Sequence, residues 1–496
     1  MLFNSFDYIV FLVLVFGLYW GLEPSASVLA RRFADGQPGR LRLLSAARTT
    51  LLLAASYLFY MSWNAVFILL IIASTLVDYA VGLALGRTKG EGKRKALVVL
   101  SLIVNLGMLG LFKYADFGIV AAGQTAGLFG VEWEPGLLRL IVPVGISFYT
   151  FQTLSYTIDV YRRRIPAHHN LLEFAMYVAF FPQLVAGPIV RAKEFLHQFA
   201  KPPRLSAAEA QSAIYLIVRG LVKKIAIADF LATSLLDRVW DNPSSFSSGE
   251  VWVAVYAYTW QLYGDFSGYT DIARGSSRLL GFELPKNFDR PFNTTGPIEF
   301  WARWHITLSR WVQDYLYIPL GGSKKGQVRS YFNLWLSFLI IGVWHGAGWT
   351  FVIFGLWHAF GVTLNRGWRQ WRASRGLSDK PPKGGWKRAA LVFISLHFFV
   401  VHWPMFRSPD LGVMMDMYEQ MFAANDWASL RIDPWVWAVI VGTGVVHFCP
   451  KAWVDRFENG VKGLPWPLMS LFVIAVGALL MHLAAGQAAP FIYFQF

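Results

Sequence analysis

Charged residues are scarce in this sequence. Only 15% of the 496 residues are Asp, Glu, Lys or Arg, whereas 55% are hydrophobic. A soluble domain carries about 25% charged residues, so these side chains are too few to cover a surface that faces water. No long polar block is present, and several apolar stretches approach the roughly 20 residues that cross a hydrocarbon core. The composition excludes ordinary soluble classes and predicts one membrane-embedded domain.

Cysteine and metal-binding patterns are also nearly absent. The single cysteine, Cys449, excludes an intramolecular disulfide and a site built from paired thiolates. The sequence contains no His-Glu-x-x-His pattern, no compact cluster of carboxylates and histidines, and no P-loop. Residues 264–268 have the glycines of a nucleophile elbow but lack its flanking strand and helix. We therefore expect no metal and no bound cofactor, which leaves histidine as a general base that deprotonates a hydroxyl.

Lys and Arg are missing before the first apolar run, residues 8–22, and five arginines follow it by residue 48. That order is the reverse of a secretory signal peptide, so we expect a retained helix whose N-terminus lies outside. The net charge of +15 is carried in short loops between apolar runs. The positive-inside rule and anionic lipid headgroups account for such loops, and nucleic acid is not an expected partner.

Alternating basic and acidic loops predict the topology. The rule places the turn at residues 62–64 outside, the basic loops at 89–95 and 162–164 inside, and the last six residues outside. In the middle of the chain, prolines interrupt residues 171–189, which predicts a re-entrant segment. Residues 251–263 are short for a span. Residues 265–329 mix Trp, Gly, Pro and charge, which predicts amphipathic interfacial or half-buried helices.

His345 is the strongest candidate functional residue. It lies at the turn of an apolar hairpin, residues 331–365, just before Gly346 and Gly348. Each arm has about 15 residues, so at about 1.5 Å per residue the turn should stop inside the bilayer. Ionisable groups at that depth are costly and are functional candidates, and the glycines would let backbone or substrate approach closely. The alternative is a structural histidine bonded to a neighbouring helix.

His305 is the second candidate. It lies in an aromatic segment, residues 300–309, that also carries Arg303 and Trp304. The alternative is an aromatic belt at the membrane interface. The remaining histidines are expected in loops or in packing roles, with His358, in the arm after His345, the best of them.

Several motifs together resemble one family, the membrane-bound O-acyltransferases, and within it the bacterial branch of alginate O-acetylation proteins. The matching segments are Phe112–Tyr114, Pro143–Tyr149, Tyr156–Arg162, Phe181–Pro188, Asp265–Asp271, Arg303–His305, Asp314–Gly322 and Gly342–Gly346. The resemblance implies an all-α polytopic fold of about 10–12 transmembrane helices, with re-entrant and interfacial helices around a central tunnel. It also implies a bacterial inner-membrane location with both termini in the periplasm.

The same resemblance implies roles for individual residues. His345 would be the catalytic histidine and His305 the second polar residue of the site, with acetyl-CoA as the cytosolic acyl donor. His305 or Arg303 would orient the donor or stabilise the oxyanion. The residues expected to support the tunnel or the substrate are Arg303, Trp304, Trp344, Asp265, Ser267, Tyr149 and Gln152.

The C-terminal segment, residues 491–496, is similar to an aromatic motif that ends a separate small protein in a related D-alanylation system. This divides the chain into a membrane-embedded domain over residues 1–490 and an acyl-acceptor motif over 491–496, with Tyr493 as the expected acyl carrier. An interfacial aromatic anchor is the alternative. The expected acceptor is an extracytoplasmic polysaccharide such as alginate, reached through an SGNH-type acetyltransferase. Alternatives are peptidoglycan O-acetylation, D-alanyl transfer and a non-enzymatic transporter.

Overall fold

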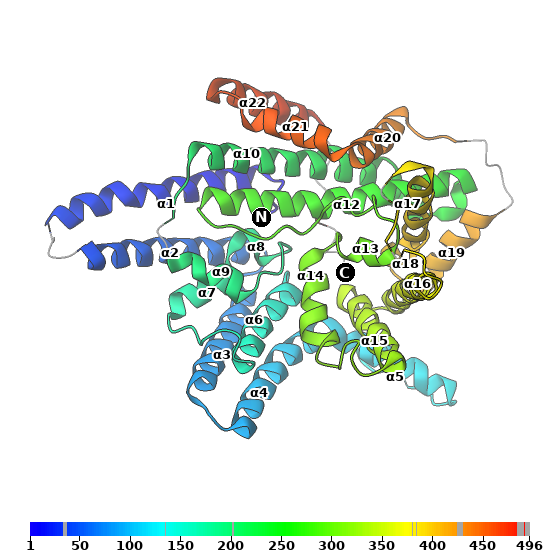
Figure 1. Cartoon of the computed structure of the whole chain (residues 1–496), viewed down its shortest axis with the longest axis horizontal. Helices are drawn as coiled ribbons and strands as arrows, with labels where there is room; N and C mark the ends of the chain where they lie inside the picture. The colour runs from blue at the N-terminus through cyan, green and yellow to red at the C-terminus, as the bar shows by residue number, and fades with distance from the viewer. Residues whose placement is uncertain are drawn as a thin grey trace. The chain divides into compact units, whose positions relative to one another are not determined.

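The computed structural model describes residues 1–32, 37–133, 135–200, 203–378, 380–382, 384–423, 430–483 and 491, with side chains except those of residues 23–42. These residues form helices joined by loops, and no strand occurs among them (Figure 1). The helical character agrees with the prediction. The described chain divides into two compact units, one of residues 1–217 and 272–285 and the other of residues 218–271 and 286–496.

The first unit contains the N-terminal helices. They are α1 (Phe6–Arg32), α2 (Gln37–Met61), η1 (Ala65–Phe67), α3 (Ile68–Arg87), α4 (Glu91–Leu109), η2 (Gly110–Tyr114), α5 (Ala115–Leu128), α6 (Ile146–Tyr161), α7 (Leu171–Ala179), α8 (Phe181–Leu184), α9 (Ala192–Phe195), η3 (Leu196–Ala200) and most of α10 (Ala207–Leu221).

The second unit contains the C-terminal helices. They are η4 (Val222–Asp229), η5 (Ala232–Leu236), α11 (Asp237–Asp241), η6 (Pro243–Ser245), most of α12 (Ser248–Leu279), α13 (Pro297–Trp301), α14 (Ile306–Val312), η7 (Gln313–Tyr317), α15 (Gln327–His345), α16 (Trp349–Ser374), α17 (Gly385–Val400), α18 (Trp403–Arg407), α19 (Leu411–Phe422), α20 (Pro434–Phe448), α21 (Lys451–Lys462) and α22 (Trp466–Leu483).

The two ends of α3 adjoin segments that the charge pattern assigns to opposite sides of the membrane, the turn at 62–64 and the basic loop at 89–95. At one end, the Met1 ammonium group donates a hydrogen bond of 2.7 Å to Ser62 Oγ, in the turn before α3. At the other end, Arg163 pairs at 2.8 Å with Glu91, the first residue of α4, which follows the loop after α3. The 20 residues of α3 span about 30 Å, the thickness of a hydrocarbon core. The N-terminus and the turn at 62–64 therefore share one end, as the alternation predicts.

A buried carboxylate joins three helices of the first unit. Asp78 on α3 accepts hydrogen bonds from Ser101 and Asn105 on α4 and from Thr157 on α6. A buried carboxyl group is tolerated when several donors satisfy its oxygens. Asp78 is thus accounted for as a clamp between helices, and it offers no open binding position.

The segment after α6 is broken, as its prolines predict. Asn170 Oδ1 accepts from the backbone N–H groups of Leu172 and Glu173 and so caps α7. This helix ends at Ala179, and the short α8 begins at Phe181 with Pro182 in its first turn. Residues 174–192 are buried within the unit. Proline removes a backbone donor and clashes with the preceding turn, which explains the break.

The middle of the chain differs from the prediction. The short apolar run at 251–263 is part of α12, which continues without a break to Leu279 and has 32 residues. Two glycines of α12 let it pack closely against residues 220–223. A Cβ on Gly264 would lie 2.9 Å from the Lys223 carbonyl oxygen, and one on Gly268 would lie 2.7 Å from that of Gly220. Separate short helices follow only from Pro297 onward, as α13, α14 and η7.

Five helical stretches of the described chain are long and apolar enough to cross a membrane. They are Leu43–Met61, Ala65–Arg87, Glu91–Leu128, Gly385–Arg407 and Trp466–Leu483. A sixth stretch joins α20 and α21, which meet at a bend of 100° (Figure 1). The chain is therefore a polytopic membrane protein. The prediction of about 10–12 transmembrane helices also included shorter and more polar helices. Length and composition alone do not identify such helices as membrane spans.

The predicted hairpin is present as α15 and α16, with its turn at Gly346–Gly348. Two glycines let the helices touch: a Cβ on Gly342 would lie 2.9 Å from the Gly355 Cα, and one on Gly355 would lie 2.6 Å from the Phe338 carbonyl oxygen. The arms have 19 and 26 residues, longer than the sequence suggested. An arm of about 28 Å can cross the hydrocarbon core, so arm length no longer places His345 short of the far face.

Candidate active site

His345 is the last residue of α15, and its ring is fixed by its own helix. The side chain is 2% exposed. Its Nδ1 lies 2.7 Å from the Ile341 carbonyl oxygen, one turn earlier. A carbonyl oxygen can only accept, so Nδ1 carries the proton and Nε2 carries the lone pair. This is the tautomer that a general base requires.

Gly346 has a different role from the one expected. A Cβ at this position would lie 2.0 Å from the Phe351 ring, so the missing side chain makes room for an aromatic residue of α16. A Cβ on Gly348 would meet nothing closer than 3.8 Å. Gly346 therefore lets the turn close beneath His345, and the Phe351 ring fills the space beside it, so no substrate can approach there.

Trp344 separates the two predicted histidines. The ring centroids of His305 and Trp344 are 5.9 Å apart, and those of Trp344 and His345 are 5.0 Å apart. On its other side, His305 packs edge-on against Phe266 of α12 at 4.8 Å. The second unit thus brings His305, Trp344 and His345 together, as the prediction of one site requires.

His305 occupies an unusual backbone conformation. Its φ of 42° and ψ of 53° place it in the left-handed region, immediately before α14. This conformation costs an L-residue with a Cβ roughly 1–2 kcal/mol, and such outliers cluster at functional sites. Its Nδ1 faces Asn287 Oδ1 at 3.3 Å. Burial lowers the pKa of His305 well below its ordinary value, and His345 adds to the effect, so the ring is neutral.

A small buried cavity of about 10 Å³, called the histidine cavity below, lies beside His345. Its lining residues are Leu262, Phe300, Trp301, Trp304, His345, Phe354, His358, His402, Trp403 and Phe406. The cavity brings in Trp304, which was predicted, and His402, which was assigned to packing. His358 was already the best of the remaining histidines. Its spacing of 13 residues after His345, on the returning arm of a hairpin, was the signal that pointed to it.

Arg303 points elsewhere. Its guanidinium group pairs at 2.6 Å with Glu299, four residues earlier. Glu299 lines a second cavity of about 660 Å³. The lining residues are Thr295, Gly296, Glu299, Asn365, Trp368, Arg369, Arg372, Lys380, Pro381, Pro382, Trp386, Lys387, Ala390 and Leu391. This basic cavity has four cationic side chains and two tryptophans, and the short helix α13 contributes residues to it and to the histidine cavity.

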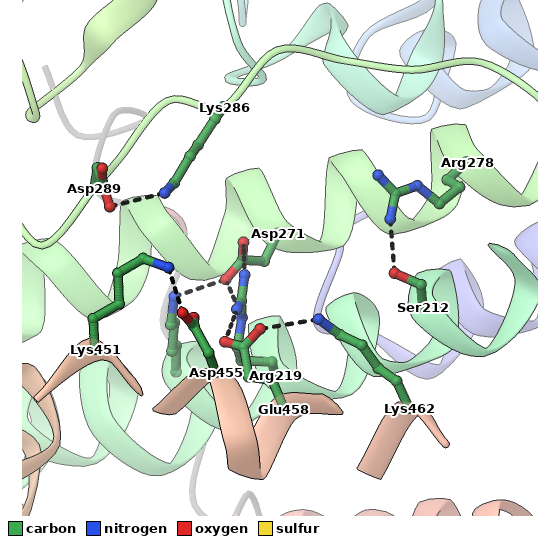
Figure 2. Close-up of polar contacts among 11 residues, drawn as sticks. Ser212, Arg219, Asp271, Arg278, Lys286, Asp289, Lys451, Asp455, Glu458 and Lys462 are labelled. Carbon is green, nitrogen blue, oxygen red and sulfur yellow. Dashed lines mark hydrogen bonds and ion pairs between the residues drawn. The ribbon is translucent and has the colours of Figure 1, made fainter. Parts of the chain in front are cut away.

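The acidic residues of the predicted segment 265–271 are paired within the second unit. Asp265 pairs at 2.8 Å with Lys224 of η4, and all three of Asp265, Lys224 and Ser267 are buried. Asp271 of α12 pairs at 2.7 Å with Arg219 (Figure 2), and it also pairs at 2.7 Å with Lys223. These ion pairs bind α12 to its neighbouring helix, which supports a packing role for this segment.

The same ion network holds α21. Arg219 pairs at 2.6 Å with Glu458, which also pairs at 3.0 Å with Lys462 (Figure 2). Asp271 is 5% exposed, and a buried carboxylate between two cations stays ionised because they stabilise its charge. The cluster is saturated by its own members and serves as a structural clamp.

Tyr149 and Gln152, the two remaining predicted residues, belong to the first unit. Both lie on α6 and are buried, at 1% and 3% exposure. Gln152 Nε2 donates to the Tyr177 carbonyl oxygen. These contacts bind α6 to α7.

Tyr493 lies outside the described residues, but Phe491 is described. Phe491 is 1% exposed, and its ring lies 4.5 Å from Tyr269 and 5.8 Å from Phe266. Phe266 is the residue that contacts His305 on its other side. The start of the C-terminal motif is therefore one aromatic ring away from His305.

No group of three or more His, Cys, Asp or Glu side chains that could hold a metal ion occurs in the described part of the chain. The histidines at the cavity are surrounded by aromatic rings instead. Proton transfer and hydrogen bonding are the chemistry that this arrangement can perform.

These features place buried histidines around a small cavity within a membrane domain, and sequence comparison identifies the class of protein. The profile of the membrane-bound O-acyltransferase family matches residues 52–398. The chain belongs to this family and is an O-acyltransferase. This confirms the predicted fold class and decides against the transporter alternative.

Several curated relatives are similar over most of the chain. A probable alginate O-acetylase of Pseudomonas putida is 36% identical over 475 residues, which covers 90% of this chain and 94% of the relative. That of Pseudomonas aeruginosa is 41% identical, covering 78% and 72%. A peptidoglycan O-acetyltransferase of Helicobacter pylori is 34% identical, covering 75% and 73%.

Proposed function

We propose that this chain is an O-acetyltransferase that takes acetyl from cytosolic acetyl-CoA and passes it across the membrane for O-acetylation of an extracytoplasmic polysaccharide such as alginate. One observation carries the proposal: the Ile341 carbonyl holds His345 as the tautomer whose Nε2 can accept a proton. The names of the relatives support the acetyl group and the polysaccharide.

His345 acts as the general base in the first transfer. Its Nε2 takes the proton of the acceptor hydroxyl while the hydroxyl oxygen attacks the thioester carbonyl carbon. The C–S bond then breaks, and the thiolate of CoA takes the proton back from His345. The proton balance closes within one turnover and requires no metal or redox partner.

The basic cavity supports a nucleotide-bearing thioester as the donor. Arg369, Arg372, Lys380 and Lys387 line it together with Trp368 and Trp386. Cationic side chains bind phosphates through charge-assisted hydrogen bonds, and a tryptophan face can stack on a purine. Asn365 lines this cavity and His358 lines the histidine cavity, and they are seven residues, or about 10 Å, apart along α16. The pantetheine arm of CoA would follow this path.

Tyr493 receives the acetyl group in this proposal. Phe491, two residues earlier, packs against Tyr269 and Phe266, which supports an approach of the following tyrosine to His305 and His345. Its phenol oxygen would attack the thioester, and the acetyl-tyrosine would then face an SGNH-type acetyltransferase outside. The serine of that partner would carry the acetyl group to the polymer.

Peptidoglycan O-acetylation is the second candidate. The similarity to the Helicobacter pylori peptidoglycan O-acetyltransferase favours it. The two candidates share every step in this chain and differ only in the polymer that the partner acetylates. Purified alginate and peptidoglycan fragments, offered separately with the partner, distinguish them.

The test uses the full chain in lipid nanodiscs with [acetyl-¹⁴C]acetyl-CoA. We expect His345→Gln to reduce CoA release by at least about 10³-fold, because removing a catalytic group typically costs this much or more. His397→Gln is the control. His397 is on α17, its ring contacts Tyr256 of α12, and it does not line the cavity.

Label on the C-terminal peptide tests the relay. Mass spectrometry should find one acetyl group on Tyr493 after incubation with donor, and Tyr493→Phe should abolish the label while the protein stays in the membrane. Full acetyl transfer to the polymer by Tyr493→Phe would contradict the relay. Undiminished CoA release by His345→Gln would contradict the base assignment.

A further inference from the structure

The histidine cavity beside His345 contains a polar group that the proposed base mechanism does not use. His358 is 1% exposed, and neither of its ring nitrogens has a hydrogen-bond partner among the described residues. Its ring is enclosed by Trp301 at 5.0 Å, Phe354 at 4.5 Å and His402 at 4.7 Å. A neutral imidazole has one donor and one acceptor, and leaving a buried one unsatisfied costs about 1–3 kcal/mol.

The cavity that His358 lines has room for a single oxygen atom. A volume of about 10 Å³ is close to the ~10–15 Å³ that one water requires. Such a small space places the three histidines that line it, His345, His358 and His402, around the same point. The other lining residues are Leu262 and aromatic side chains, three of them tryptophans, so an oxygen placed there meets histidine nitrogens and indole N–H groups as its polar partners.

We propose that His358 is a second catalytic residue, which donates a hydrogen bond to the carbonyl oxygen of the acyl thioester. In the resting enzyme one water fills the cavity, and the carbonyl oxygen replaces it when the donor binds. This assignment rests on the proposed acetyl transfer and adds to it the group that stabilises the oxyanion.

The reaction then proceeds as follows. The acceptor oxygen forms a bond to the thioester carbon as His345 takes its proton, and the C=O electron pair moves onto the carbonyl oxygen. The N–H of His358 stabilises the resulting oxyanion in a water-excluded site, where such a bond is strong. The electron pair returns, the C–S bond breaks, and the thiolate takes the proton from His345.

Two variants distinguish a hydrogen-bond donor at position 358 from a ring that only fills space. His358→Phe fills the site without an N–H group, whereas His358→Gln retains one. Losing one oxyanion donor costs about 10²–10³-fold in kcat, so we expect this loss for His358→Phe, with a KM for acetyl-CoA within about twofold of the parent enzyme. His358→Gln should recover at least about tenfold over His358→Phe.

The control is His397→Phe, because His397 lies on α17 and does not line the cavity. Full kcat in His358→Phe would overturn the assignment, and so would equal losses in the Phe and Gln variants at equal amounts of membrane-inserted protein. Failure of the parent enzyme to transfer acetyl from acetyl-CoA would instead overturn the proposed function. The two failures are therefore distinguishable.

Discussion

At the scale of single residues, the site depends on hydrogen bonds that fix which nitrogen carries a proton. His345 and His305 both turn Nδ1 toward an oxygen, the Ile341 carbonyl in one case and Asn287 Oδ1 in the other. Asn287 Oδ1 also accepts from the N–H and hydroxyl groups of Thr307, which holds the amide in place. Partners of this kind orient a catalytic imidazole and set its tautomer.

The charges of the basic cavity give a prediction about donor affinity. Arg372→Gln and Arg369→Gln should each raise the KM for acetyl-CoA about threefold to tenfold with little change in kcat. A bond to a charged group contributes about 1.5–3 kcal/mol when buried, and partial exposure reduces it. Steady-state CoA release at two ionic strengths measures the effect.

The matched control for this prediction is Arg375→Gln. Arg375 is in the same basic segment but lies over the Trp371 ring, 5.7 Å from its centroid, and does not line the cavity. An acetyl thioester of CoA without the 3′-phosphate should show a smaller difference between Arg372→Gln and the parent enzyme. Equal KM values for all three arginine variants and the parent would contradict a phosphate role for this cavity.

Sequence patterns predicted some of these residues and not others, for physical reasons. His345 was predictable because a histidine beside glycines in an apolar hairpin is costly without a role. The ion pair of Arg303 with Glu299 was not predicted, because Arg303 lies in the turn after α13 and its contact depends on how that turn folds. The lack of a hydrogen-bond partner for His358 among the described residues was not predicted either, because it depends on rings that are distant in sequence, from α13, from α17 and from His402 just before α18.

At the scale of secondary-structure elements, close backbone contact holds the hairpin that carries His345. Gly342 is three residues before His345 and faces Gly355 of α16. Small residues at such a crossing let membrane helices approach closely and gain van der Waals contact. Any side chain at Gly342 would push the helices apart directly beneath the turn that carries His345.

We therefore expect Gly342→Ala to destabilise the protein. Its Cβ would lie 2.3 Å from the Phe351 carbonyl oxygen, and overpacking of this kind costs about 1–3 kcal/mol. The control is Gly367→Ala on α16, where a Cβ meets nothing within 4 Å. Thermal unfolding in detergent should show a lower midpoint for Gly342→Ala and an unchanged or raised one for Gly367→Ala. Equal midpoints would contradict the glycine crossing.

Element lengths were less predictable than element types. The sequence indicated helices throughout, because long apolar runs without strand periodicity favour them. It indicated that residues 251–263 are short for a span and that separate interfacial or half-buried helices follow, because Trp, Gly, Pro and charge are mixed from residue 265 onward. Asp265 and Asp271 belong to that mixed segment. Both carboxylates are instead paired with lysines of η4, so α12 continues. Pairing between distant helices is a tertiary effect that a local pattern does not contain.

At the scale of the whole molecule, the order of loops along the chain would set the direction of the proposed transfer. Basic side chains gather in residues 366–388, next to the cavity proposed for the donor. The N-terminus is tied to the turn at 62–64. If the basic segments face the cytosol, acetyl-CoA enters from its own compartment and the C-terminal motif leaves from the opposite face.

The sidedness can be measured with single cysteines. Cys449→Ser removes the only native thiol, and Ala65→Cys and Ser378→Cys then place one thiol beside the turn at 62–64 or in the basic segment. Both parent residues are exposed. In intact cells a membrane-impermeant maleimide should label Ala65→Cys at once, and it should label Ser378→Cys only after permeabilisation.

The reverse pattern would place the basic cavity outside, where acetyl-CoA is absent. The donor assignment would then fail even if His345 remained essential, because the base chemistry depends on the Ile341 contact and not on orientation. Labelling of both sites in intact cells would mean that the two ends of the topology share one face. The expected pattern is the one in which a cytosolic thioester can serve an acceptor outside the membrane.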